Sequence, residues 1–298
     1  MIIVRLVGGL GNQLFQYAIA RRMSVETRQP LKLDLTAYEA YPLRAYSLRP
    51  FNTCQDVATP DEIRRVRPSP DEAGTVSWPS RVLRNLRYSK TWIRERTPYA
   101  YDPRVVQAGG DVHDVYDIYL EGYWANEAYF KPIEAMIRQE FTITPEPEGE
   151  NLAAARAIAA AESVCLHVRR GDYATDPATL GFHGLASLSY YEQAVARLTQ
   201  TVADPHFFIF SDDPAWVREH LRLTHTATYV THNSADKDYE DLRLMASCRH
   251  HIIANSSFSW WGAWLAQRPG QVVIAPAKWL NQPGIETSGA TPAHWVRL

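Results

Sequence analysis

Cysteine is scarce in this 298-residue chain, and neither sign of charge dominates it. The three cysteines, Cys54, Cys165 and Cys248, are far apart and lack the spacing of metal ligands. This pattern predicts buried thiols in a reducing compartment and no disulfide. The formal net charge is -2, whereas proteins that bind nucleic acid normally need a basic surplus for their phosphate contacts. We therefore expect no nucleic-acid partner.

A long apolar segment and a charged leader are also lacking. Residues 1–7 (MIIVRLV) read as a β-strand, so we expect neither a signal peptide nor a membrane anchor, and predict a cytoplasmic location. A basic helix face could nevertheless be formed by Arg81, Arg84, Arg87, Lys90, Arg94 and Arg96. A solvated face explains these residues, and attraction to an acidic membrane surface or an anionic acceptor is the alternative. Peripheral contact with the inner face of a membrane therefore stays open.

Short apolar runs alternate with helical patterns along most of the chain, which is typical of α/β folds. A strand, a glycine turn, a helix and a second strand open the sequence and form a βαβ unit. A second series of strands and helices follows the linker-like segment TPEPEGE at residues 144–150. We predict two Rossmann-like domains that face a central cleft, 1–148 with a helical insertion within 41–103, and 149–298.

The most informative stretch reads HVRRGDY, at residues 167–173, and directly follows an apolar run that predicts a buried strand. A strand that ends in an arginine pair brings positive charge to the carboxyl edge of a sheet, where open α/β folds bind ligands. Arginine suits a diphosphate because its planar guanidinium makes paired hydrogen bonds and stays charged when partly buried. Arg169 and Arg170 therefore predict an anionic ligand.

A glycine-rich turn at residues 8–13 (GGLGNQ) lies between the first strand and the first helix. Glycines at such a place let the backbone approach phosphate at a helix N-terminus, as in dinucleotide-binding folds. Leu14 stands where that fingerprint needs a small residue, so the match to a NAD site is incomplete and a turn without a ligand is the alternative. Asn12 and Gln13 add amides that we expect to be exposed and to suit sugar hydroxyls.

A serine-rich turn, NSSFSWWG at residues 255–262, lies between a predicted strand and a predicted helix. Its hydroxyls and backbone N–H groups can converge on a phosphate, and helix capping by Ser256 or Ser257 is a compatible alternative. The tryptophans that follow have helical spacing, which favours a place in the core over a sugar platform. They are Trp260, Trp261 and Trp264.

Two acidic groups, Asp212 with Asp213 and the DKD segment at residues 236–238, raise the question of a divalent cation. We expect no metal, because the arginine pair can neutralise a diphosphate and Pro214 favours a helix cap or turn after Asp213. Asp241 begins the helix before the serine-rich turn. Hydrogen bonding to a nucleobase and simple capping are its two open interpretations.

Four motifs together resemble the α-1,2-fucosyltransferases of glycosyltransferase family 11. They are GLGNQLFQYA at 9–18, HVRRGDY at 167–173, FSDD at 210–213 and NSSFSWW at 255–261, in the family's order. The resemblance implies a GT-B fold, GDP-fucose as the donor, and metal-independent transfer with inversion at the anomeric carbon. It also implies an α-1,2 linkage to galactose in an oligosaccharide or lipid-linked glycan, made by a bacterial, cytoplasmic member of the family.

The resemblance further implies roles for individual residues. Arg169 is expected to bind the β-phosphate and stabilise the departing GDP, which is electrostatic leaving-group catalysis. Asn12 is expected across the cleft, near the fucose or the acceptor hydroxyl, where a neutral amide can orient but not deprotonate. The catalytic set is Arg169, Asp172, Asn12 and His167. The other donor-binding residues are Gly11, Gln13, Arg170, Ser211, Asp212, Asp241, Asn255, Ser256, Ser257 and Phe258.

A base is useful because the galactose 2-hydroxyl must lose its proton as it attacks. Asp172 is the leading candidate, with Asp176 and His183 on the acceptor side behind it. Bracing of the arginines by Asp172 is the alternative, and a loose, cation-like transition state needs no strong base. Two other functions stay open from the residues alone. They are a NAD-dependent oxidoreductase and a non-catalytic carbohydrate-binding protein, the latter supported by nine Trp and sixteen Tyr.

Overall fold

The computed structural model describes residues 1–39, 44–67, 91–108, 116–171 and 176–298. The chain divides into two compact units, Met1–Thr142 (unit 1) and Ile143–Leu298 (unit 2). The domain boundary predicted between residues 148 and 149 lies a few residues further along the chain, where helix α6 (Gly149–Ala159) begins.

Unit 1 is built on a four-stranded, all-parallel sheet in the order β2-β1-β4-β3. Its strands are β1 (Ile2–Arg5), β2 (Leu31–Asp34), β3 (Trp92–Arg94) and β4 (Ile118–Glu121). Strand β1 lies between β2 and β4. Its apolar residues Ile2, Ile3 and Val4 are fully buried, as is typical of a central strand in a parallel sheet. Helix α1 (Leu10–Thr27) joins β1 to β2 and completes the predicted βαβ unit.

The helices of unit 1 after α1 are short. They are α2 (Pro60–Val66), α4 (Pro103–Gln107), α5 (Glu134–Glu140) and the 3₁₀ turns η1 (Thr36–Tyr38), η3 (Glu127–Tyr129) and η4 (Lys131–Ile133). The sequence pattern from Tyr129 to Phe141 predicts one helix. The structure has 3₁₀ turns first, because Pro132 lacks the N–H that a continuous α-helix would use there.

The predicted helical insertion and the basic helix face need correction where the structure describes them. Residues 92–94 form β3, which pairs with β4 at the edge of the sheet, so this part of the insertion is a strand. Arg94 lies on that strand, with its guanidinium carbon 4.4 Å from the centroid of the Trp92 ring. The basic residues between Arg81 and Lys90 lie outside the described residues.

Unit 2 has a six-stranded parallel sheet in the order β10-β9-β8-β5-β6-β7. The strands are β5 (Ser163–Val168), β6 (His206–Ser211), β7 (Ala227–Val230), β8 (His250–Ile252), β9 (Val273–Ala275) and β10 (Val296–Arg297). The chain runs outward from β5 through β6 to β7, then returns to pair β8 on the other side of β5. The carboxyl ends of β5 and β8 therefore flank the topological switch point, where sheets of this order bind their ligands.

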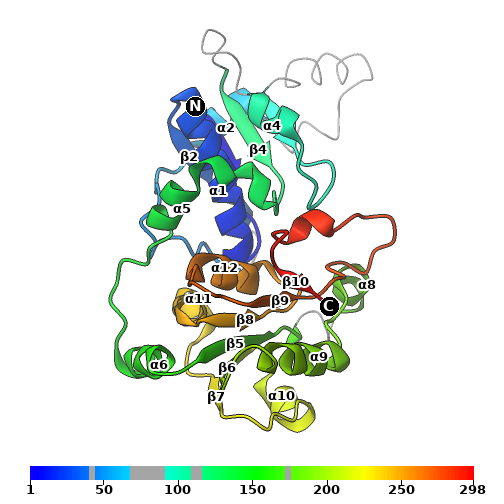
Figure 1. The fold of residues 1–298 in the computed structure, drawn as a ribbon. Helices are drawn as coiled ribbons and strands as arrows, with labels where there is room; N and C mark the ends of the chain where they lie inside the picture. Colours follow the sequence, from blue (N-terminus) through cyan, green and yellow to red (C-terminus); the bar gives the residue numbers. More distant parts are fainter. Residues whose placement is uncertain (40–43, 68–90, 109–115, 172–175) are drawn as a thin grey trace. The chain divides into compact units, whose positions relative to one another are not determined.

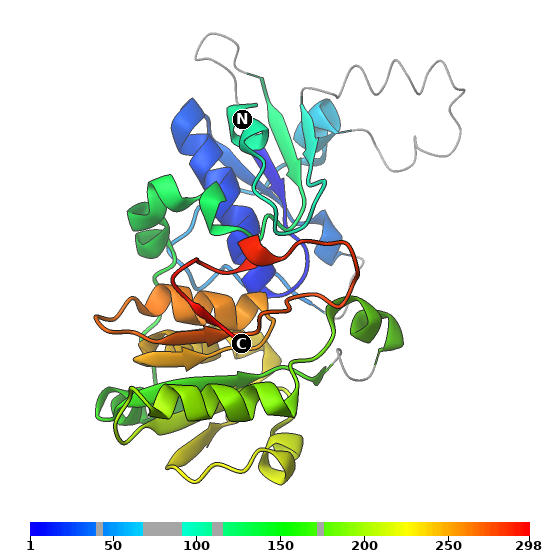
Figure 2. The same cartoon turned by 45° about the vertical axis from the view of Figure 1, so that its right-hand side comes forward.

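Helices cover both faces of this sheet (Figures 1 and 2). They are α6, α9 (Leu188–Thr199), α10 (Pro214–His220), α11 (Asp238–Ser247) and α12 (Ser257–Ala266), while α8 (Pro177–His183) lies between β5 and α9 along the chain. Successive side chains of a strand point to opposite faces, so Val164, Leu166 and Val168 pack in one core cluster with α9. Cys165 packs in the other cluster, with α6 and α11. The predicted pair of Rossmann-like α/β units is confirmed.

The cysteines are free thiols, with Cys165 and Cys248 buried and Cys54 partly buried. Cys165 and Cys248 share one core cluster, where burial raises the pKa of both thiols well above the usual value. Both thiols therefore stay protonated and unreactive in the folded protein. Within the residues described, no helix has the length and apolar character needed to span a bilayer.

Candidate active site

The two arginines of the HVRRGDY motif lie at the carboxyl end of β5, directly beside the end of β6. The strands are in register at Val168 and Ser211, so the residues that follow them meet at the same edge. Arg169 Nη1 forms an ion pair with Asp212 Oδ2 at 2.9 Å, and the backbone N–H of Arg170 donates to Asp212 Oδ1 at 2.8 Å. One carboxylate therefore fixes both the Arg169 side chain and the backbone that carries it.

Gly171 allows this close approach. A Cβ at position 171 would overlap the Asp212 carboxylate, so a side chain there would push the carboxylate away from Arg169. The Arg169 side chain remains 22% exposed, so it is not fully enclosed by the protein.

Arg170 is directed toward the neighbouring helix α10. Its Nε lies 3.4 Å from Asp213 Oδ2, and its guanidinium carbon lies 3.8 Å from the centroid of the Trp216 ring. Asp213 also caps α10, as the sequence predicts, by accepting the N–H of Trp216 at 3.1 Å, and its own N–H donates to Ser211 Oγ at 3.0 Å. Arg170 is thus part of a brace between β5, β6 and α10.

The roles of Asp213 and Trp216 in this brace were not predicted from the sequence. A signal was present, because an Arg-Arg pair and an Asp-Asp pair follow consecutive apolar strands of one series. Adjacent parallel strands end at the same edge, so opposite charges in these two places predict ion pairs.

His167 is the penultimate residue of β5 and lies in the interior. It is 5% exposed, and its ring centroid is 6.0 Å from that of Phe258. Burial lowers the pKa of His167 to about 3, and the nearby positive charge of Arg169 adds to the effect. The imidazole is therefore neutral at physiological pH. Its Nδ1 is buried and has no hydrogen-bond partner among the residues that the structure describes.

The serine-rich turn follows β8 on the other side of β5. Ser256 is the N-cap of α12, with its Oγ accepting the N–H of Phe258 at 3.3 Å. The predicted capping is therefore confirmed for Ser256. Ser257 is the first residue of the helix, and both Ser257 and Phe258 are partly exposed at its N-terminus. The turn thus presents a helix N-terminus at the switch point.

Asn255 holds the loops around this turn together. Its Nδ2 donates to the carbonyl oxygens of His183 at 3.0 Å, Gly184 at 3.4 Å and Trp279 at 3.3 Å. Because the residue is only 4% exposed, its amide nitrogen is committed to protein backbone. Its Oδ1 is buried without a partner in the described part of the chain.

The tryptophans of α12 belong to the core, as their spacing predicts. Trp260, Trp261 and Trp264 are 1%, 0% and 4% exposed, and their rings pack against one another at centroid distances between 4.9 and 6.1 Å. They anchor α12, whose N-terminus lies at the switch point.

Asp241 lies within the first turn of α11, and the cap position is Lys237. Its Oδ1 accepts Asn233 Nδ2 at 2.8 Å, and Asn233 exchanges two amide hydrogen bonds with Asn151. Burial raises the pKa of the Asp241 carboxyl. The capping interpretation is wrong, and the nucleobase contact stays a prediction.

The candidate bases are only partly described. Asp172, the leading candidate, lies outside the described residues. Asp176 is exposed just before α8, and His183 ends that helix. The identity of the base stays a prediction.

The glycine-rich turn of unit 1 is shorter than expected. Gly8 has a φ of 78°, and a Cβ there would meet Asn12 Nδ2 at 2.6 Å. Helix α1 begins at Leu10 with Gly9 as its N-cap, so Gly11, Asn12 and Gln13 already belong to its first turn. Asn12 is partly exposed there.

The expectation of an exposed amide at Gln13 is wrong. Gln13 is fully buried, and its Nε2 donates to the carbonyl oxygens of Gly8 at 3.0 Å and Ala45 at 2.8 Å. Its Oε1 accepts the N–H of Ser47 at 2.9 Å. The side chain fixes the loop around the glycines and, because it is fully buried, is unavailable to a sugar.

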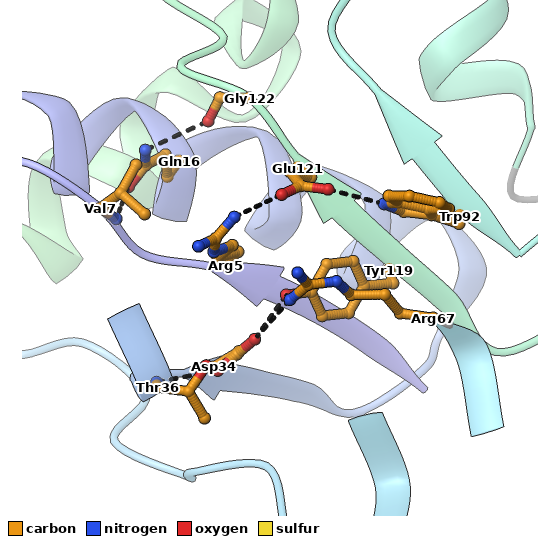
Figure 3. Close-up of polar contacts among 10 residues, drawn as sticks. All are labelled: Arg5, Val7, Gln16, Asp34, Thr36, Arg67, Trp92, Tyr119, Glu121 and Gly122. Atoms are coloured by element: carbon orange, nitrogen blue, oxygen red, sulfur yellow. Dashed lines mark hydrogen bonds and ion pairs between the residues drawn. The ribbon is translucent and has the colours of Figure 1, made fainter. Parts of the chain in front are cut away.

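The geometry of Asp34 weighs against the NAD interpretation. In dinucleotide-binding units an acidic residue at the end of the second strand binds a ribose hydroxyl. Asp34 ends β2, but it is fully buried, and its Oδ1 accepts the N–H and hydroxyl of Thr36 at 2.9 and 2.7 Å. Its Oδ2 accepts the Tyr119 hydroxyl, and Arg67 lies 3.9 Å away (Figure 3). This carboxylate is unavailable to a cofactor.

No cluster of three or more His, Cys, Asp or Glu side chains with the arrangement of a metal site occurs in the parts of the chain that are described. Asp212 and Asp213, considered as cation ligands from the sequence, are instead paired with Arg169 and Arg170.

Comparison with known proteins shows the family. The model of glycosyl transferase family 11 matches residues 104–298. An α-1,2-colitosyltransferase of Escherichia coli is 31% identical over 303 residues, with 100% of this chain and 99% of that protein covered. The O-antigen biosynthesis glycosyltransferase WbnK of Escherichia coli is 28% identical over 307 residues, with 98% and 99% covered. A galactoside 2-α-L-fucosyltransferase, SEC1 of Bos taurus, is 30% identical over 153 residues, with 49% and 42% covered.

The fold is also similar to that of a solved structure. The crystal structure of the NodZ α-1,6-fucosyltransferase soaked with GDP-fucose matches with a TM-score of 0.52 and 15% identity, over 92% of this chain and 94% of that one. This similarity confirms the predicted GT-B class, while the central cleft stays a prediction. Together with the matched motifs, the comparisons show that the chain belongs to glycosyl transferase family 11.

Proposed function

We propose that this glycosyltransferase moves L-fucose from GDP-fucose to the 2-hydroxyl of a galactose in an oligosaccharide or lipid-linked glycan, with inversion at the anomeric carbon. The observation that carries the proposal is the position of Arg169 and the Ser256 turn on the two strand ends that flank the switch point of unit 2. A braced guanidinium on one strand end and a helix N-terminus on the next suit a diphosphate. The names of the curated relatives support an α-1,2 linkage.

In the proposed reaction, the oxygen of the galactose 2-hydroxyl forms a bond to the anomeric carbon as the bond from that carbon to the β-phosphate oxygen breaks. The hydroxyl proton leaves to a base, for which Asp172, Asp176 and His183 are the candidates, or to solvent. GDP departs with the bonding electron pair. Arg169 stabilises the negative charge that develops on the β-phosphate, and this interaction strengthens in the transition state.

The other residues of the site position the Arg169 guanidinium or add contacts to the substrates. Asp212 holds the Arg169 guanidinium through one of its oxygens, and Arg170 secures the strand end through Asp213 and Trp216. His167 can add a hydrogen bond but no charge, because its imidazole is neutral. Ser256, Ser257 and Phe258 contribute the helix N-terminus, and Asn12 is the proposed contact to the sugar from unit 1.

The relative that is 31% identical favours a second donor. Its name is α-1,2-colitosyltransferase. In sugar chemistry, colitose is the 3-deoxy form of L-fucose and lacks the 3-hydroxyl. The same diphosphate site would accept either GDP-sugar, so the choice depends on contacts to that hydroxyl. A site that hydrogen-bonds a hydroxyl strongly rejects the analogue that lacks it. Comparing kcat/KM for GDP-fucose and GDP-colitose decides between the two donors.

The test of the proposed function is transfer of labelled fucose from GDP-fucose to lactose, with the new linkage determined by NMR. We expect an α-1,2 linkage and a loss in kcat of about 10²–10³ for Arg169→Ala, as for removal of one preorganised transition-state contact. Arg169→Lys should recover only part of the loss, because the ammonium lacks the paired donors. Arg156→Ala, an exposed arginine on α6, is the matched control.

Failure of the wild-type protein to transfer fucose or colitose to any galactoside would overturn the proposed function. Near-normal transfer by Arg169→Ala would overturn the role of Arg169. The predicted cytoplasmic location and peripheral membrane contact remain part of the proposal.

A further inference from the structure

The turn that follows β4 in unit 1 has an unusual backbone. A Cβ at Gly122 would overlap the Glu95 side chain and lie 2.9 Å from Trp124 Cε2, so this position has no room for a side chain. Trp124 has a φ of 57°, in the left-handed region that tryptophan rarely adopts. Such a conformation costs about 1–3 kcal/mol and persists only where the surroundings enforce it.

Buried side chains enforce this turn. Glu95 Oε2 accepts the N–H of Tyr123 at 2.7 Å, and its Oε1 accepts the N–H of Trp124 at 3.0 Å. The Trp124 ring is fully buried and packs edge-on against Tyr129 at a centroid distance of 5.6 Å. Burial raises the pKa of the Glu95 carboxyl, so the fold accepts a desolvated acid in order to hold two backbone N–H groups.

Gln16 fixes the same turn from the other side. Its Oε1 accepts the N–H of Val7 at 3.0 Å, and its Nε2 donates to the Gly122 carbonyl at 3.1 Å (Figure 3). Val7 follows β1 and Gly122 follows β4, so the buried amide connects these two neighbouring strand ends. Gln16 therefore ties the turn after β4 to the end of β1.

Tyr123 is the exposed residue of this turn. Tyr123 is 49% exposed, while the Gly122 carbonyl is held by Gln16 and the Trp124 side chain is fully buried. A half-exposed aromatic residue on a rigid, strained turn at the carboxyl edge of a parallel sheet is expected where a ligand is met. Tyrosine supplies a flat apolar face and a polar tip at little cost in side-chain entropy, which suits the C–H face of a sugar ring.

We propose that Tyr123 is the platform on which a sugar ring of the glycan acceptor stacks, and that Glu95 is the positioning residue that holds this platform. The inference rests on the proposed function, because it names the acceptor of that reaction. Unit 2 carries the cationic edge that suits a diphosphate. The edge of unit 1 at Tyr123 offers an exposed aromatic ring, which suits a neutral glycan better than an anion.

The experiment measures initial rates of Tyr123→Ala with GDP-fucose and lactose, varying each substrate separately. We expect the acceptor KM to rise about tenfold, equivalent to roughly 1.4 kcal/mol, while kcat and the donor KM stay within about twofold. Tyr123→Phe and Tyr123→Trp should keep the wild-type acceptor KM to within about threefold, because the flat ring is retained. Tyr123→Leu should resemble the alanine variant.

The matched control is Tyr116→Ala. Tyr116 is 41% exposed and precedes β4, whereas Tyr123 follows that strand, so the two tyrosines lie at opposite ends of one strand. We expect no change in acceptor KM for Tyr116→Ala. Glu95→Gln replaces one acceptor oxygen by a donor and should raise the acceptor KM, without changing kcat, by less than Tyr123→Ala does.

The outcomes separate this inference from the proposed function. If the wild-type protein transfers fucose but Tyr123→Ala keeps its acceptor KM, only the platform is overturned. The platform is also overturned if Tyr123→Ala raises the donor KM as much as the acceptor KM. Should Tyr123→Ala not fold, Tyr123→Leu against Tyr123→Phe makes the same comparison.

Discussion

Arg169 and Asp212 form an ion pair of 2.9 Å that connects the carboxyl ends of β5 and β6. Asp212 also accepts the N–H of Arg170, so its two oxygens serve one segment of chain. A carboxylate in this position reduces the net positive charge of the site. In return it gives the Arg169 guanidinium one orientation before a ligand arrives, and preorganised charges are the effective ones in catalysis.

Asp212→Asn tests this orientation. The amide retains one acceptor oxygen but loses the charge that holds Arg169, so we expect kcat/KM for the GDP-sugar to fall about tenfold to a hundredfold. Isothermal titration with GDP checks the binding component separately. Unchanged GDP affinity together with unchanged kcat would show that Arg169 needs no brace.

Gly171→Ala tests the same contact without removing a charge. The added methyl group overlaps the Asp212 carboxylate, so Asp212 must move and the ion pair with Arg169 must lengthen. We expect a loss of transfer activity comparable to that of Asp212→Asn. Gly181→Ala is the control, because a Cβ at Gly181 in α8 meets nothing within 4 Å. Equal activities of the two alanine variants would contradict the close-approach argument.

Asn255→Ala is expected to lower the free energy of unfolding by about 2 kcal/mol, because three backbone carbonyls lose a buried donor. Asn255→Asp should lower the free energy of unfolding further, since it places a carboxylate against those carbonyls. Urea denaturation measures both changes. Asn281→Ala, at an exposed asparagine, should stay within about 0.5 kcal/mol of the wild type. A similarly small effect for Asn255→Ala would mean that the loops are held in other ways.

The buried imidazole of His167 makes stability depend on pH. Its pKa in the folded protein, about 3, lies below the ordinary value of 6.5, so its contribution is complete above pH 6.5 and is lost as the pH falls toward 3. Between pH 7 and pH 5 we expect a loss of about 2 kcal/mol from this residue. Urea denaturation at both pH values should show a smaller pH dependence for His167→Gln. Parallel pH profiles for the two proteins would contradict the assignment.

Metal dependence is tested by assaying transfer with EDTA in excess. We expect full activity, because the arginines and the α12 N-terminus are proposed to carry the charge of the diphosphate. Loss of activity with EDTA and its recovery with magnesium or manganese would contradict the prediction.

The main strands could be predicted from the sequence, because β5 and β6 are continuous apolar runs that a buried parallel sheet requires. The edge strands β7 and β10 were missed, since β7 is half exposed and β10 has two residues. The prediction of an exposed amide at Gln13 is wrong, because the glycine pattern indicates a turn at residues where helix α1 has already begun at Leu10. At each of these places the local sequence pattern indicates one structure and the tertiary contacts impose another.

The site was predictable in its charges but not in its contacts. The sequence places two arginines after β5 and two aspartates after β6, yet their pairing depends on which strands become neighbours. The same holds for Glu95, whose partners lie on the turn after β4 and are brought to it by the parallel pairing of β3 with β4. Opposite charges after two strands predict an ion pair only if those strands are neighbours, and the neighbour relation came from the structure.

The amide of Gln16 has a consequence for hydration. If this side chain were shortened to alanine, the N–H after β1 and the C=O after β4 would face an amide-sized void with a donor and an acceptor at its walls. Such a polar void is large enough to hold a water molecule, which would loosen the joint between the two strand ends. Gln16 therefore keeps the interior of this edge dry and lets the turn behind it stay stiff.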